Sequence, residues 1–229
     1  MNLAILGATS AIAQETARCF AAEGASFFLV ARDAAKCAIV ADDLRARGAA
    51  DVQTFIADLA DFSRHAELAA AAPQSIDITL IAHGTLPDQN AIDDDPAAQA
   101  ASFELNATSF ISLAAHFANR SKTLAVIGSV AGDRGRRSNY VYGAAKAALD
   151  TYCEGLRARG TNVVFIKPGW IDTPMTSHVR KNPLFASAQT AGRLIHDAIL
   201  ARRAVVYVPW FWRWISLIVR MLPAKLVKF

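Results

Sequence analysis

The chain has 229 residues, of which 53% are hydrophobic and 19% are charged, a length that suits one α/β domain without a second of ordinary size. This apolar fraction excludes a disordered chain, and 12 Gly with 8 Pro are too few for a fibrous one. The three cysteines (Cys19, Cys37 and Cys153) are odd in number and far apart. That pattern argues against a disulfide framework or a zinc knuckle and favours a reducing, cytoplasmic location.

The formal net charge is +4, but the positive charges are concentrated toward the C-terminus. No acidic residue follows Asp197, and subtracting the six later cations from +4 leaves the rest of the chain at −2. A slightly acidic body disfavours a nucleic-acid partner. The first ten residues lack the basic start and long apolar core of a signal peptide. The six cations are Arg202, Arg203, Arg213, Arg220, Lys225 and Lys228.

Short apolar runs alternate with alanine-rich stretches along the chain. Most of the runs show little polar–apolar alternation, as expected for strands that helices cover on both faces. The stretches between them carry helix punctuation, such as Gly24 and Gly48 just past helix ends and the cap Asp95 before Pro96. The expected strands are Leu3–Leu6, Ser26–Ala31, Asp51–Ile56, Ile76–Ala82, Thr123–Ile127, Asn162–Ile166 and Ala204–Val208. The expected helices are Ala11–Glu23, Ala34–Arg47, Ser63–Ala71, Pro96–Asn119, Val141–Arg159 and Ala188–Ala201.

This alternation predicts βαβ units joined by right-handed crossovers. The fold class is therefore α/β: a doubly wound, mostly parallel seven-stranded sheet of the Rossmann type, with helices on both faces. Residues 1–209 would form this domain. Residues 210–229 would be an apolar, basic appendage rather than a separate domain.

The first strand runs into the first helix through a turn that begins at Gly7. Such a turn points backbone N–H groups and the positive end of a helix dipole at an anion, normally a pyrophosphate. Gly7 permits the sharp turn, and the small Ala11 and Ala13 permit close approach of the backbone. An ordinary βα turn would look the same, so the motif is weak on its own. The expected contacts are Gly7, Thr9, Ser10, Ala11 and Ile12.

The residues after the second strand bear on the choice of nucleotide. An acidic side chain here binds the ribose 2′-hydroxyl of NAD, whereas an arginine accommodates the 2′-phosphate of NADP. Arg32 favours NADP(H), and Asp33 keeps NAD(H) open as the less favoured cofactor. After the third strand, Asp58 is placed either to bind the adenine amine or to cap a helix.

Tyr142 and Lys146 are four residues apart and therefore share one helix face. A lysine beside a phenol stabilises the phenolate, which makes the tyrosine a usable acid or base. Ser129 lies thirteen residues before Tyr142, at the end of the fifth strand. Parallel-sheet sites lie at such carboxyl edges, so the serine hydroxyl is placed to bind a substrate oxygen.

The pattern resembles the short-chain dehydrogenase/reductase family over nearly the whole chain. The family's Tyr-x-x-x-Lys matches Tyr142 and Lys146, and its serine and helix asparagine match Ser129 and Asn106. Its Pro-Gly-x-x-x-Thr matches residues 168–173. Together and in this order the elements make a specific match, although Tyr-x-x-x-Lys alone is common by chance.

The sequence departs from the family pattern in two places. The Gly-x-x-x-Gly-x-Gly turn has Gly7, Ala11 and Ala13, and the usual Asn-Ala-Gly after the fourth strand is Ala82-His83-Gly84. Neither departure removes a catalytic group, but both bear on how the cofactor sits. His83 is interpreted as a local structural substitute rather than a catalyst.

The resemblance implies hydride transfer between nicotinamide and a carbonyl or alcohol carbon. Tyr142 would exchange the proton, Lys146 would hold the nicotinamide ribose, and Ser129 would orient the carbonyl oxygen. Asn106 would hold a water in a proton relay. Thr173 and the backbone of Ile171 would anchor the carboxamide. Further cofactor contacts would come from Leu59, Ala82, His83, Gly84, Pro168 and Gly169, and no metal is expected.

Two segments bear on the substrate. Arg134, Arg136 and Arg137 lie between Ser129 and Tyr142, either as a clamp for a phosphate or carboxylate or as a solvated loop or subunit contact. Met175 opens a segment, residues 175–187, that in the family forms a mobile lid.

The tail Trp210–Phe229 mixes Trp, Phe and Leu with Arg and Lys. Its apolar stretch is far shorter than the roughly 20 residues that span a bilayer. This composition suits a segment lying at a membrane surface, at the inner face of the membrane, although a C-terminal arm docked on its own or a neighbouring subunit is the alternative.

With the arginine loop, the tail suggests a lipid-linked substrate, of the kind reduced by bacterial polyprenyl-phosphate-linked keto-sugar reductases. The family resemblance implies a homodimer or homotetramer. A catalytically silent NADP-binding regulator or a membrane-recruited scaffold is the alternative, but an intact Ser129, Tyr142 and Lys146 favours an enzyme.

Overall fold

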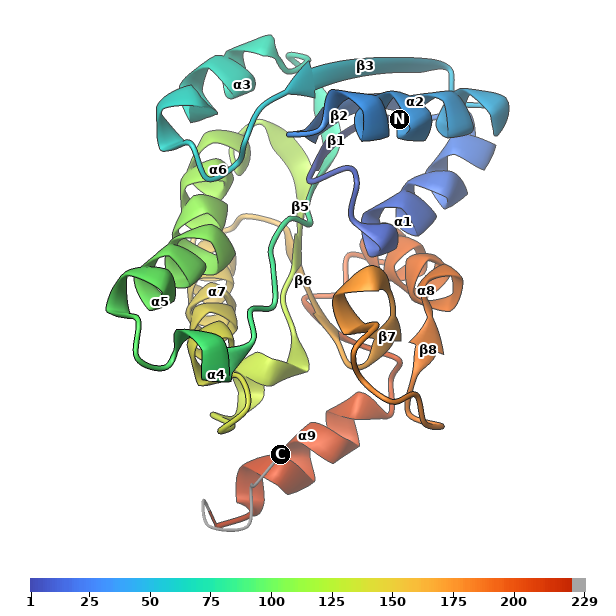
Figure 1. Ribbon diagram of the computed structural model, residues 1–229. Helices are drawn as coiled ribbons and strands as arrows, with labels where there is room; N and C mark the ends of the chain where they lie inside the picture. Colours follow the sequence, from blue (N-terminus) through green and yellow to red (C-terminus); the bar gives the residue numbers. More distant parts are fainter. Residues whose placement is uncertain (224–229) are drawn as a thin grey trace.

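The computed structural model describes residues 1–223 (Figure 1). Lys225, Lys228 and Phe229 of the predicted membrane segment therefore lie outside the described residues. The strands are β1 (Asn2–Leu6), β2 (Ser26–Ala31), β3 (Asp51–Ile56), β4 (Ile76–Ile81), β5 (Ser121–Ile127), β6 (Val163–Pro168), β7 (Ile171–Asp172), β8 (Ala186–Ser187) and β9 (Val205–Val208). The helices are α1 (Ala11–Ala22), α2 (Ala34–Ala46), α3 (His65–Ala71), α4 (Gln89–Ile92), α5 (Pro96–Phe103), α6 (Ser109–Phe117), α7 (Tyr140–Ala158), α8 (Ala188–Leu200) and α9 (Trp212–Met221). Short 3₁₀ or π turns are η1 (Phe62–Arg64), η2 (Glu104–Thr108), η3 (Val130–Asp133) and η4 (Pro174–Thr176).

Seven strands form one sheet in the order β3-β2-β1-β4-β5-β6-β9, and every neighbouring pair is parallel. The predicted doubly wound fold is confirmed. The chain builds outward from β1 to β3 and then returns to β4 on the other side of β1. A crevice at the carboxyl ends of β1 and β4 is where ligands bind in such sheets.

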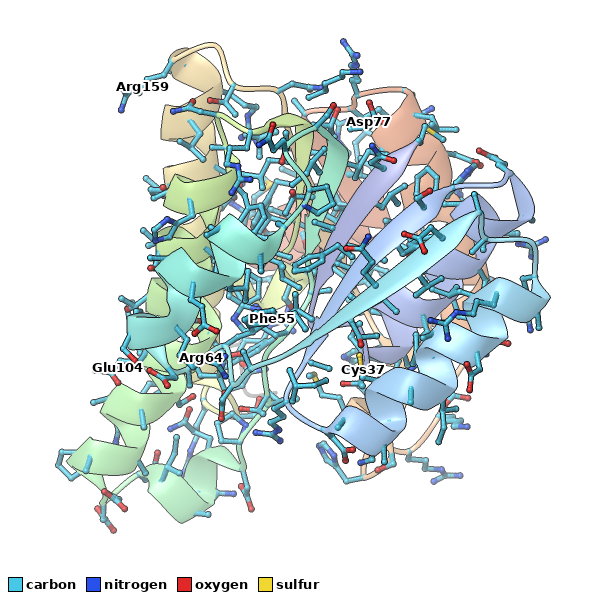
Figure 2. All side chains as sticks on the ribbon, turned by 90° about the horizontal axis from the view of Figure 1, so that it is seen from above. Cys37, Phe55, Arg64, Asp77, Glu104 and Arg159 are labelled. Carbon is cyan, nitrogen blue, oxygen red and sulfur yellow. The ribbon has the colours of Figure 1, made fainter. Side chains whose placement is uncertain are left out.

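Helices cover both faces of the sheet (Figures 1 and 2). One apolar core joins the sheet to α1, α2 and α8, and a second joins it to α3, α6 and α7. Along β1, Leu3 and Ile5 belong to the first core, whereas Ala4 and Leu6 belong to the second. Because both faces are buried, the strands need apolar residues at every position, which explains their lack of alternation.

All three cysteines are unpaired, and Cys37 lies on the buried side of α2. On the opposite face, the Arg64 guanidinium lies 5.2 Å from the centre of the Phe55 ring (Figure 2), a cation–π contact at the margin of the second core.

The single helix expected over Pro96–Asn119 is wrong. Asp95 caps its start as predicted, accepting a hydrogen bond from the Ala98 N–H at 3.0 Å. The π turn η2 then separates α5 from α6. The extra residue of a π turn shifts the helix register without ending the helix, so a hydrophobic pattern does not reveal it. The short β7, β8 and α4 and the helix α9 were not expected either.

A buried ionic cluster joins four elements near the end of β6. The Lys167 ammonium lies 2.5 Å from Asp133 of η3 and 2.7 Å from Asp150 of α7. The Tyr207 hydroxyl of β9 donates to the other oxygen of Asp133 at 3.0 Å. These two carboxylates raise the pKa of Lys167 against the opposing effect of burial. The cluster fixes η3 to the sheet and to α7.

Lys167→Met should therefore destabilise the fold by about 3 kcal/mol, because it leaves Asp133 buried without a counter-charge. The free energy of unfolding from urea titration measures this loss. The matched control is Lys122→Met, which removes an exposed ion pair with Asp77 and should cost less than about 1 kcal/mol. Equal losses in the two variants would contradict a structural role for the cluster.

Candidate active site

The turn between β1 and α1 leaves the first N–H groups of the helix without a side-chain cap. Gly7 has a φ of +94°, and a Cβ there would lie 2.6 Å from the backbone N of His83, so the turn can touch the segment after β4 only with glycine. Ser10 is the N-cap of α1, yet its side chain forms no capping hydrogen bond, and the first turn holds no acidic residue. The first N–H groups of α1 are thus open to a phosphate. Thr9, Ser10, Ala11 and Ile12 are all partly exposed.

Just after β2, the two candidate ribose ligands, Asp33 and Arg32, have different surroundings. Asp33 is the N-cap of α2, and its carboxylate accepts from the Lys36 N–H at 3.0 Å. Arg32 is exposed, and its side chain forms no hydrogen bond or ion pair with any described residue. The Asp33 carboxylate is thus already used as a helix cap. Arg32 is the group left available at the position where this fold binds the 2′ substituent of the ribose.

Asp58 follows β3, as expected, and is exposed. Its carboxylate accepts from the Ala60 N–H at 2.9 Å within its own turn. Asp61 is the residue that caps the next helical turn, through the N–H of Ser63. Interpreting Asp58 as a helix cap is therefore wrong. The neighbouring Leu59 is buried beneath this turn.

Ser129, Tyr142 and Lys146 meet where η3 packs against α7. Two glycines allow this contact: a Cβ on Gly132 would lie 2.8 Å from the Lys146 backbone, and one on Gly143 would lie 2.9 Å from the Ala131 carbonyl oxygen. The Ser129 hydroxyl accepts from the Ala131 N–H at 3.0 Å, so its own proton is available to another acceptor. The sequence analysis missed both glycines, since a close approach between distant segments leaves no local signal.

Burial controls the ionisation of the reacting pair. It raises the pKa of Tyr142 to about 12, and the neighbouring Ser129 hydroxyl opposes this effect. Burial also lowers the pKa of Lys146 to about 7. Among residues 1–223 the Lys146 ammonium contacts no acidic group; it lies 4.3 Å from the centre of the Phe110 ring and 5.5 Å from that of Tyr142. It also donates a long hydrogen bond, 3.4 Å, to the Ile127 carbonyl.

Asn106 lies in η2 and is completely buried. Its amide donates to the Ser102 carbonyl at 2.9 Å, and its oxygen accepts from the Thr85 N–H at 3.1 Å. Gly84 lies between Asn106 and the lysine: a Cβ there would lie 2.6 Å from the Asn106 Oδ1 and 3.8 Å from the Lys146 Nζ. The structure thus brings Asn106, Gly84 and Lys146 together, as the resemblance implies. The π turn explains the placement, since such turns recur at functional sites.

His83 is a structural residue in this arrangement. Its ring stacks on Phe110 at a centroid distance of 3.9 Å, and its Nε2 lies 2.6 Å from the Ser109 hydroxyl. The Ser109 hydroxyl donates to the Leu105 carbonyl, so the histidine is the donor to it. Burial, with a smaller effect of Lys146, holds the His83 pKa well below 6.5. The ring is therefore neutral. Ala82, just before it, continues the ladder by donating to the Leu6 carbonyl.

The start of α7 is held by α4, which the sequence analysis did not find. The buried Gln89 accepts from the Val141 N–H at 3.1 Å and donates to Asp93 at 3.0 Å. The Tyr140 hydroxyl also donates to Asp93, at 2.9 Å. Gln89 thus caps the helix that carries Tyr142. A four-residue helix has too short a hydrophobic pattern to be recognised in a sequence.

The turn after β6 lies beside α9. Pro168 ends β6, and a Cβ on Gly169 would lie 2.1 Å from the Trp212 indole. Ile171 is buried, and its carbonyl accepts from the Thr176 hydroxyl at 2.6 Å. The same hydroxyl accepts from the Thr173 N–H at 3.2 Å. Thr176 therefore shapes the predicted carboxamide anchor, a role that sequence analysis did not assign. Met175 is exposed at the start of the expected lid.

The three loop arginines do not share one environment. Arg134 donates to the Leu222 carbonyl just past α9, at 3.2 Å. Arg136 is buried, and burial lowers its pKa. Arg137 is exposed. Because α9 occupies Arg134, the three arginines do not form one clamp in this structure, and whether the loop binds a phosphate or carboxylate or is a solvated loop or subunit contact stays a prediction. Across residues 1–223 there is no group of His, Cys, Asp and Glu that could hold a metal ion.

The family model for short chain dehydrogenases matches residues 2–184. The chain belongs to the short-chain dehydrogenase family. It is 35% identical to an uncharacterized oxidoreductase of Mycobacterium tuberculosis over 96% of this chain and 92% of that protein. It is 31% identical to a galactitol 2-dehydrogenase (L-tagatose-forming) of Cereibacter sphaeroides, over 79% of this chain and 75% of that protein. It is therefore an oxidoreductase acting on alcohol or carbonyl groups.

Solved structures agree on the fold. A short-chain dehydrogenase from Sphingobium yanoikuyae, in complex with NADPH, superimposes with a TM-score of 0.82 at 24% identity, over 95% of this chain and 92% of that one. The residues of this short-chain dehydrogenase also fit a nicotinamide dinucleotide. The uncapped start of α1 suits the pyrophosphate, Arg32 the ribose of the adenosine, and Lys146 with Asn106 the nicotinamide side. When bound, this cofactor supplies or accepts the hydride.

The buried, unpaired Lys146 is kept at a cost in stability. Its pKa is about 7 in the folded chain and about 10.4 in the unfolded one. The unfolded chain therefore binds more protons between these values, so the cost is complete below about pH 7 and diminishes as the pH rises. Lys146→Met should raise the Tm, and by more at about pH 6 than at about pH 9.

Thermal unfolding of the cofactor-free variant and wild type at both pH values measures this difference. Lys36→Met, at an exposed lysine of α2, is the matched control and should change the Tm little at either pH. A gain that is larger at the alkaline pH would contradict the unpaired burial of Lys146.

Proposed function

We propose that this short-chain dehydrogenase is an NADP(H)-dependent ketone reductase. The observation that carries the proposal is the convergence of Ser129, Tyr142 and Lys146 at the contact between η3 and α7, with Asn106 beyond Gly84. A catalytically silent regulator or a scaffold would need none of these groups. The site lies at the carboxyl edge of the sheet, where the fold opens to ligands.

Each residue has a defined task in the reduction. The Ser129 hydroxyl, free to donate, holds the carbonyl oxygen of the substrate. Tyr142 gives its phenolic proton to that oxygen as negative charge develops on it. Lys146 binds ribose hydroxyls and stabilises the resulting phenolate. Asn106, fixed by Ser102 and Thr85, holds the water through which Lys146 returns a proton to the site.

The pKa of Tyr142 describes the protonation state in which the phenol enters the reaction. At about 12 it keeps the phenol protonated at neutral pH, and the protonated phenol is the form that reduction requires. Alcohol oxidation needs the phenolate, which burial disfavours. Burial therefore keeps the Tyr142 phenol protonated, which is the state in which it can donate a proton.

Tyr142→Phe tests this assignment, because it removes the proton donor and keeps the ring. Turnover should fall by roughly 10²–10⁴-fold, the usual contribution of a positioned acid, while NADPH binding remains. Consumption of NADPH is followed with keto-sugars, including L-tagatose, and with simple ketones. Tyr152→Phe, on the same helix and away from the site, is the control and should keep full turnover. Equal turnover in the two variants would exclude Tyr142 as the proton donor.

The preference for NADP(H) is supported by the free Arg32 and the committed Asp33. Arg32→Ala should weaken NADPH binding by roughly 10–100-fold, since hydrogen bonds to charged groups contribute about 1.5–3 kcal/mol. The affinity for NADH should stay the same. Titration of nicotinamide fluorescence measures both constants.

Arg47→Ala, at the opposite end of α2, is the matched control and should leave both affinities unchanged. If wild type binds NADH as tightly as NADPH, the assignment of Arg32 to the 2′-phosphate fails.

For the substrate we propose a keto-sugar linked to a polyprenyl phosphate. The sugar part is supported by the relative named as a galactitol 2-dehydrogenase, which forms a ketose. The lipid part is supported by α9, which lies beside the turn after β6. Arg137 is the exposed arginine of the loop and the candidate contact for the phosphate.

A further inference from the structure

Helix α9 presents two apolar faces. Its inner face (Trp212, Ser216 and Val219) is buried against the body of the protein. Its outer face (Trp214, Leu217, Ile218 and Met221) follows the spacing i, i+3, i+4, i+7 and is 47–78% exposed. Trp210, just before the helix, is 70% exposed and extends this face. A surface helix with one core-facing side would carry polar residues on the other.

The inner face anchors α9 firmly. The Trp212 indole packs over Gly169 and lies edge-on to Trp170, at a centroid distance of 5.6 Å. Arg134 holds the far end of the helix through the Leu222 carbonyl. In Figure 1, α9 lies across the lower end of the molecule. The exposed apolar face is thus held in place rather than loosely attached.

The charges beside this face indicate what covers it. Arg213 and Arg220 are seven residues apart, so they lie along one margin of the outer face, and both are exposed. The sequence adds Lys225 and Lys228 and contains no acidic residue after Asp197. A partner must therefore be apolar at its centre and anionic at its edge. A second copy meeting the same face about a two-fold axis would bring these arginines against each other.

We propose that the outer face of α9 docks this enzyme on an anionic lipid bilayer. Exposed tryptophans suit the headgroup level, aliphatic side chains suit the acyl boundary, and arginines suit lipid phosphates. The described residues contain no helix long and apolar enough to cross a membrane. At ten residues, α9 has the length to lie in the interface, spanning about 15 Å.

In this docked orientation, the active site lies on the side of the protein that is toward the bilayer. The inner face of α9 touches η3, which follows Ser129, and the turn at Gly169. The site would then take its ketone from an amphiphile held in the membrane. This last step rests on the proposed function, whereas docking itself does not.

The test is sedimentation of the full chain with vesicles. Vesicles of phosphatidylglycerol and phosphatidylcholine should bind the protein, those of phosphatidylcholine alone should bind it weakly, and high salt should release it. Ile218→Gln should weaken binding by roughly tenfold, by removing one buried apolar side chain. Arg213→Gln with Arg220→Gln should weaken it by roughly 10–30-fold. Ile39→Gln, at a similarly exposed isoleucine of α2 (69%), is the matched control and should bind as wild type does.

Three results would overturn the proposal: no binding to anionic vesicles, equal binding to neutral vesicles, or equal binding by Ile218→Gln and wild type. If Ile218→Gln instead halves the mass measured by light scattering without affecting vesicle binding, the face is an interface between copies of the chain. NADPH affinity is measured for the α9 variants and for Ile39→Gln, and in these it should not change. Arg32→Ala should lose NADPH affinity and keep vesicle binding, which separates failure of the docking surface from failure of the proposed function.

Discussion

The active site depends on one close contact, the packing of η3 against α7. Ser129 precedes η3, while Tyr142 and Lys146 lie on α7, so these groups meet only if the two segments approach to within backbone contact. Gly132 and Gly143 allow that approach because neither carries a Cβ. The ionic cluster around Lys167 then holds η3 from the other side through Asp133. Packing and charge pairing thus act together on the same short turn.

Around this contact the protein contains groups that reduce the stability of its fold. Lys146 is buried without a counter-charge from any described residue, and Asn106 lies in a π turn that interrupts a regular helix; both lie beside Gly84. Burying an unpaired ammonium costs stability, which the two apolar cores on either side of the sheet must offset. Catalytic sites commonly carry such costs, since a proton donor and an ammonium are needed where water is excluded.

The C-terminal helix links this centre to the surface. Trp212 covers the turn after β6, and Arg134 extends from the catalytic loop to the end of α9. The loop arginine that the sequence suggested as a phosphate ligand is thereby used inside the protein. The outer face of α9 is apolar with a cationic margin. The shape of the active site and the attachment of the enzyme to a membrane would therefore both depend on this one helix.

The sequence by itself determined the fold class, because continuous apolar strands separated by amphipathic helices are compatible with few arrangements other than a doubly wound parallel sheet. It also located Ser129, Tyr142 and Lys146 by their spacing and order, and Asn106 through the family resemblance. Only the tertiary structure decided what depends on contacts between distant segments: Gln89 capping α7, the cap made by Asp33 that leaves Arg32 free, and the separate surroundings of the three loop arginines. Local patterns encode which face of an element is apolar, but not which partner meets that face or takes up a given hydrogen bond.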